Sequence, residues 1–231
     1  MLIALIWKDV RINRLPLLLG AVLLVAPYFI VGLAVTHMPL WKEATMASAW
    51  SVLLATGSHF SVMCFQPTLA ILSGNLIAVE RGDRSAEFLG YLPPSRGLVL
   101  LSKGLVLAGV FILVWGWSLL VCAIAYWLSP ESDASEELTS HLASLPRFAC
   151  IGLLAAGAGW FASANVDNSG PAVALGLAAP AVLFGLLLAF QSAFNAPNDL
   201  AFSKVYFVLC PILAAACFAI GTFTYLRRVE P

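Results

Sequence analysis

The sequence predicts an all-α polytopic membrane protein with six transmembrane helices. Hydrophobic residues make up 61% of the 231 residues and charged residues only 10%, whereas a soluble domain carries about 25% charged residues. The charges gather in short stretches between apolar runs that are long enough to cross a bilayer. Such a chain cannot cover a water-facing surface. Its formal net charge of zero gives no reason to expect nucleic-acid binding.

Residues 1–14 predict an amphipathic helix that lies in the plane of the membrane interface. At helical spacing they carry an apolar stripe and a basic strip, formed by Leu2, Ile3, Ile6, Trp7 and Val10 and by Lys8, Arg11 and Arg14. A plain cytoplasmic extension of the first span is the alternative. No small-x-small cleavage site follows the first apolar run, so we expect no cleaved signal peptide.

Six apolar runs follow in one transmembrane domain, each long enough for the roughly 20 residues that a span needs. The predicted spans are 15–35, 44–79, 104–128, 148–164, 171–190 and 205–225. The second run is longer than one crossing requires and contains Pro67. The acidic stretch 129–147 is predicted as an external loop, and residues 165–170 as a tight turn.

Lysine and arginine set the predicted orientation. Six spans put both termini on one side, together with residues 80–103 and the turn at 165–170. That side holds nine of the 12 Lys and Arg residues, so the positive-inside rule places it in the cytoplasm. The expected location is the cytoplasmic (inner) membrane of a prokaryote, as a multi-pass protein.

The stretch 80–103 is the densest cluster of charge in the chain. One charge near the bilayer centre costs about 2.5–3.5 kcal/mol on insertion scales, so we expect this stretch to be an aqueous connection between spans two and three. Asp83 or Ser85 can cap a short helix through Glu87, Phe88 and Leu89, which Pro93 and Pro94 end. A short helix of this kind suits docking against a soluble partner.

Few residues in the spans carry recognisable chemistry. His59, Gln66 and Asn75 are the polar members of the second span and the candidates for a substrate path. The chain has no phosphate-binding GxxxxGK[ST] motif and no HExxH. The five cysteines lie in apolar runs without metal-site spacing, so we expect no metal site and core roles for all five.

Small residues recur at four-residue spacing on the fifth span, where they allow close helix approach. These residues are Gly170, Ala174 and Ala178, and then Ala181, Gly185 and Ala189. They serve either packing within the subunit or an interface with a second subunit.

The combination of an interfacial basic helix, six spans and a charged central segment resembles the permease subunits of ABC type-two transporters. The matching residues, in order, are Glu80, Arg81, Gly82, Glu87, Phe88, Leu89, Leu92, Pro93, Ser95, Arg96 and Lys103. Residues 83–85 depart from the usual Gly-Thr step, and Gly90-Tyr91 replaces a common pair of leucines.

The resemblance implies an ATP-driven exporter in which this chain is not itself an enzyme. The chain would pair with a second permease, identical or different, on two copies of an ABC ATPase that bind ATP and Mg²⁺. Its central segment would be the coupling helix, so the predicted ATPase-coupling residues are the matching ones together with Asp83, Ser85 and Tyr91. Gly170, Ala174, Ala178, Ala181 and Gly185 would form the dimer interface. The alternatives are an intramembrane enzyme and a non-transporting anchor that recruits a soluble partner.

Overall fold

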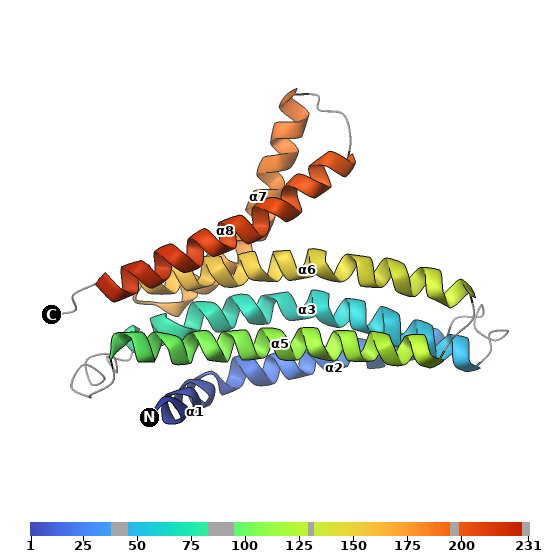
Figure 1. Cartoon of the computed structure of the whole chain (residues 1–231), viewed down its shortest axis with the longest axis horizontal. Helices are drawn as coiled ribbons and strands as arrows, with labels where there is room; N and C mark the ends of the chain where they lie inside the picture. Colours follow the sequence, from blue (N-terminus) through green and yellow to red (C-terminus); the bar gives the residue numbers. More distant parts are fainter. Residues whose placement is uncertain (38–45, 83–94, 129–131, 195–198, 228–231) are drawn as a thin grey trace. The chain divides into compact units, whose positions relative to one another are not determined.

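The computed structural model describes residues 1–37, 46–82, 95–128, 132–194 and 199–227 (Figure 1). Within these ranges it contains seven helices and no strand, which confirms the predicted all-α class. The helices are α1 (Leu2–Ile12), α2 (Arg14–His37), α3 (Met46–Gly82), α5 (Arg96–Leu128), α6 (Ser132–Asn165), α7 (Ser169–Phe194) and α8 (Asp199–Arg227).

Six of these helices are long and apolar enough to cross a membrane, as predicted. The candidate spans are Arg14–Ala34, Leu53–Glu80, Arg96–Leu128, Leu142–Asn165, Ser169–Ala193 and Lys204–Arg227. Each overlaps one predicted span. The tight turn between the fourth and fifth spans is also present, because α6 ends at Asn165 and α7 begins at Ser169.

Three helices begin at least six residues earlier than the hydropathy predicts, and one of them is α8, which begins at Asp199 and not at 205. The stretch 132–147, predicted as a loop, belongs to α6. It is rich in Ala, Glu and Leu, which favour helix, and acidic residues suit a helix N-terminus. Likewise α5 begins at Arg96 and not at 104. Its charged first turns extend a helix of 33 residues, about 50 Å long, beyond the roughly 30 Å of hydrocarbon.

The chain divides into two compact units, which are described separately. The first comprises Met1–Leu17, Pro67–Ala108 and Ala149–Pro231, and the second Leu18–Gln66 and Gly109–Phe148. The helices α2, α3, α5 and α6 each contribute residues to both units, and in α3 the boundary falls at Pro67.

Glycine allows close helix contacts in the first unit. A Cβ atom on Gly74 of α3 would lie 2.8 Å from the backbone nitrogen of Val173 in α7. A Cβ atom on Gly157 of α6 would lie 2.9 Å from the carbonyl oxygen of Ala214 in α8. These approaches bring α6, α7 and α8 around a core that includes Leu154, Tyr206 and Cys210.

The second unit has its own apolar core, built from α3, α5 and α6. The buried members are Ala55, Val62, Cys122, Ala125 and Leu145. Leu54, Trp115 and Phe148 pack against them. The two cysteines that are fully buried, Cys122 and Cys210, thus lie in apolar cores, as the sequence predicts.

Candidate functional site: a buried charge network

The site lies in the first unit, where the end of α3 and the start of α5 flank residues 83–94. Helix α3 carries Glu80 in its last turn and ends at Gly82. Ser95 caps α5, because its hydroxyl and its carbonyl oxygen both accept from the N–H of Leu98, at 3.3 Å and 2.9 Å. The cap fixes where α5 begins and thereby where Lys103, two turns further along, is placed.

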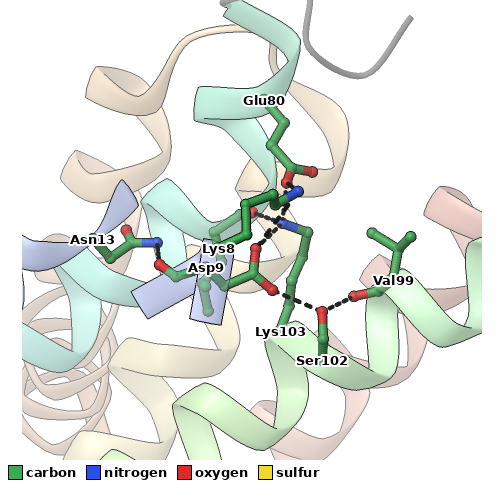
Figure 2. A network of polar contacts seen from close by, with 8 residues as sticks. Lys8, Asp9, Asn13, Glu80, Val99, Ser102 and Lys103 are labelled. Atoms are coloured by element: carbon green, nitrogen blue, oxygen red, sulfur yellow. Dashed lines mark hydrogen bonds and ion pairs between the residues drawn. The ribbon is translucent and has the colours of Figure 1, made fainter. Parts of the chain in front are cut away.

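Lys103 is the centre of the network (Figure 2). Its side chain is 1% exposed. The ammonium group donates to the carboxylates of Asp9 and Glu80, at 3.3 Å and 2.9 Å, and to the carbonyl oxygen of Leu76, at 2.5 Å. An ammonium group has three donors, so all three are used. This complete set of partners satisfies the hydrogen-bonding capacity of the buried ammonium group.

Asp9 reaches the network from α1. Its side chain is 2% exposed, and its second carboxylate oxygen lies 2.7 Å from the hydroxyl of Ser102. That hydroxyl also lies 2.8 Å from the carbonyl oxygen of Val99. Asn13 ends α1, since its side-chain amide and its backbone N–H both donate to the carbonyl oxygen of Asp9, at 2.9 Å and 3.1 Å. Hydrogen bonds therefore fix both the carboxylate and the backbone carbonyl of Asp9.

A second lysine completes the charge balance. Lys8, also on α1, forms an ion pair with Glu80, and its side chain is 32% exposed. Two lysines and two carboxylates give the network a formal charge of zero. Because each charge has an opposite partner, the network avoids the several kcal/mol per ion that an uncompensated buried charge costs. Its members connect three helices, α1, α3 and α5.

The predicted coupling residues fall into three groups: buried residues, residues at the helix ends, and residues outside the described part of the chain. Glu80 and Lys103 are buried and contact α1, while Ser95 and Arg96 are exposed at the start of α5. Arg81 and Gly82 are the last residues of α3. The predicted docking helix lies outside the described residues, and with it Asp83, Ser85, Glu87, Phe88, Leu89, Tyr91, Leu92 and Pro93.

The polar residues proposed for a substrate path have separate surroundings. His59 lies 3.2 Å from the hydroxyl of Ser144 and edge-on to the ring of Phe148. The side-chain amide of Gln66 donates to the carbonyl oxygen of Val62 in its own helix. Both belong to the second unit, whereas Asn75 belongs to the first. The hydrogen bonds of His59 and Gln66 thus go to different partners, and Asn75 belongs to the other unit.

The small residues of the predicted interface share one property. Gly170, Ala174, Ala178, Ala181 and Gly185 are all exposed on α7. The close contact of α7 within the unit is made instead by Gly176, where a Cβ atom would lie 3.0 Å from the carbonyl oxygen of Ala155. Among the described residues, the predicted stripe is therefore left uncovered.

Sequence reasoning identified Glu80 and Lys103 but not Asp9, Ser102 or Asn13. One signal was present, because Asp9 is the only acidic residue before Glu43 and stands in an otherwise basic and apolar segment. Leu5, Asp9 and Asn13 also follow one another at four-residue spacing, which places them on one helix face. An isolated acid on such a face indicates a buried partner of opposite charge.

No protein-family model, no curated protein and no solved structure matches this chain.

Proposed function

We propose that this chain is the membrane-spanning permease subunit of an ATP-driven ABC exporter, coupled to a separate ATPase subunit. The observation that carries the proposal is the buried network at the helix ends that flank residues 83–94. Glu80 of α3 forms an ion pair with Lys8 of α1, and Lys103 of α5 forms one with Asp9 of α1. Glu80 and Lys103 also pair with each other. A segment that docks on a motor must be joined to rigid elements if it is to transmit force, and this network joins α1, α3 and α5.

In this proposal Glu80 and Lys103 act inside the permease. They position the two helix ends, while the docking contacts come from the residues between them and from the exposed Ser95 and Arg96. This division differs from the sequence interpretation, which gave all of these residues to the ATPase contact. It follows from the burial of Glu80 and Lys103, at 4% and 1% exposure.

The exposure of two spans supports a second permease subunit. Only 11% of the apolar window is buried in each of Arg14–Ala34 and Ser169–Ala193, against 61% in Leu53–Glu80. In the proposed transporter these two spans line the subunit interface and the substrate path. The exposed small residues of α7 would then allow a second subunit to approach closely.

The test is association of the full chain with an ABC ATPase in its native membrane. We expect the tagged wild-type protein to retain an ATPase that carries the phosphate-binding loop absent here. Phe88→Ala and Glu87→Lys should either lose this ATPase or uncouple its ATP hydrolysis from transport. All six spans should still be inserted in both variants. Ile212→Ala, at an exposed site on α8, is the control and should retain it. Absence of any ABC ATPase from the wild-type protein would overturn the proposal.

Non-transporting anchors would pass that association test, so a second measurement separates them. Purified chain and ATPase are reconstituted into vesicles, and ATP hydrolysis is measured with candidate amphipathic cargoes. Stimulated hydrolysis with movement of the cargo supports the exporter. Binding of the ATPase with neither stimulation nor movement identifies an anchor.

A further inference from the structure

Helix α1 presents two opposite rows of side chains. The inner row consists of Leu5, Asp9 and Asn13, which are 8%, 1% and 3% exposed. The outer row consists of Ile3, Trp7 and Arg11, of which Ile3 and Trp7 are 82% and 70% exposed. At about 100° per residue, the two rows lie about 160° apart. The outer row therefore points away from the unit that holds the inner one.

The charges of α1 are divided in the same way. Asp9 and Lys8 are neutralised inside the network by Lys103 and Glu80 (Figure 2). Arg11 of α1 and Arg14, the first residue of α2, are exposed, and neither forms an ion pair within the part of the chain that the structure describes. The exposed charges of this region are consequently positive, and they lie near the exposed side chain of Trp7.

The place of α1 along the chain brings this face to the membrane surface. Only Asn13 separates the end of α1 at Ile12 from the first candidate span, which begins at Arg14. The C-terminal end of α1 therefore lies near the edge of the hydrocarbon, and Trp7 is five residues, about 8 Å along the helix, from that end. Tryptophan prefers this depth, and basic residues there meet the lipid phosphates.

We propose that the outward face of α1 binds the headgroups of anionic phospholipids. Arg11 and Arg14 contact the lipid phosphates, and Trp7 and Ile3 enter between the headgroups and the acyl chains. Charge complementarity selects this occupant, because two arginines beside exposed apolar side chains match an anionic bilayer surface. The inner row fixes the rotation of α1, so the network keeps the outer row turned toward the lipid. The inference does not depend on the proposed transport function.

The experiment uses the full chain in vesicles without any ATPase. The vesicles mix phosphatidylglycerol with phosphatidylcholine at one fixed ratio, and the quenching bromine atoms are placed on one lipid or on the other. The chain has seven tryptophans, so the difference between wild type and Trp7→Phe isolates the fluorescence of Trp7. We expect Trp7 to be quenched more strongly by brominated phosphatidylglycerol than by brominated phosphatidylcholine, per mole of lipid.

The arginines are tested by Arg11→Gln combined with Arg14→Gln. Each arginine is expected to enrich anionic lipid by up to about fivefold, so the double variant should lose the preference. The control Arg147→Gln removes an exposed arginine far along the chain on α6 and should keep it. High salt should weaken the preference of the wild type, which provides a test that needs no variant.

Three results would overturn the proposal. Equal quenching by the two lipids means that α1 has no preference for charge. A preference that survives both the double variant and high salt means that Arg11 and Arg14 do not cause it. Lack of quenching by either lipid means that Trp7 does not enter the lipid, because a second copy of the chain covers this face or because the face lies in water.

Discussion

The two units differ in the polar groups that they bury and in the partners of those groups. The first unit buries full charges, with Lys103, Asp9 and Glu80 each paired to an opposite charge. In the second unit, two of the buried serines, Ser61 and Ser118, donate to carbonyl oxygens of the backbone. Ser61 donates to Leu24 at 2.7 Å, and Ser118 donates to Val114 of its own helix at 3.0 Å.

This difference shows that buried ion pairs restrict which helices can pack together more strongly than buried hydroxyls do. A buried hydroxyl can change its backbone acceptor with little loss, whereas a buried charge needs its own partner of opposite sign. The ion pairs therefore determine which helix ends meet, whereas the hydroxyl of Ser61 adds adhesion between two helices that are already in contact. The predictions below test this ranking, from the largest expected effect to the smallest.

Replacing Lys103 should cause the largest loss of stability. Lys103→Met leaves the two carboxylates of Asp9 and Glu80 with a single lysine, Lys8, between them, and breaking a buried pair in this way costs about 3–5 kcal/mol. The free energy of unfolding is measured with the purified protein in mixed micelles of mild and denaturing detergent. Lys204→Met, at an exposed lysine on α8, is the matched control and should change it by less than about 0.5 kcal/mol.

A double variant separates lost pairing from lost packing. Asp9→Asn combined with Lys103→Met removes one charge of each sign and leaves the pair of Lys8 and Glu80 in place. We expect it to recover most of the stability that Lys103→Met loses, because no uncompensated charge remains. If the double variant is as unstable as the sum of the two single variants, charge pairing does not explain the network.

An apolar substitution in the first unit should have an intermediate effect. Gly74→Ala places a Cβ atom 2.8 Å from the backbone nitrogen of Val173, and such overpacking costs about 1–3 kcal/mol. Gly109→Ala is the control, because nothing lies within 4 Å of its added Cβ atom. That variant should gain up to about 1 kcal/mol from better helix propensity. Equal effects of the two would mean that α3 and α7 are not in close contact.

The sequence predicts the helices far better than it predicts the site. Hydrophobic runs locate the six spans, because each must bury its backbone in hydrocarbon over a known length. The same reasoning assigns Glu80 and Lys103 to an aqueous segment, since a single charge cannot enter the bilayer alone. It cannot predict that Asp9, 94 residues before Lys103, neutralises it. Pairing between distant residues depends on the fold, which local patterns do not contain.

Removing a hydroxyl from the second unit should have a small effect. Ser61→Ala loses one interhelical hydrogen bond, and such bonds in membrane proteins contribute about 0.6 kcal/mol on average. The same detergent titration should show a loss below about 1.7 kcal/mol, the upper end of that range. A loss as large as that of Lys103→Met would remove the distinction between the two units.

The contact between His59 and Ser144 should matter no more than that of Ser61, and it also tests the alternative of an intramembrane enzyme. A serine hydroxyl 3.2 Å from a histidine nitrogen has the spacing of a nucleophile and its base. Neutral polar pairs between membrane helices also occur simply as adhesion. Under the proposed permease function, Ser144→Ala should leave ATP-driven transport unchanged and lose about 0.6 kcal/mol of stability. Complete loss of biological activity in a stable, inserted Ser144→Ala protein would favour the enzyme, because adhesion alone requires no reactive hydroxyl.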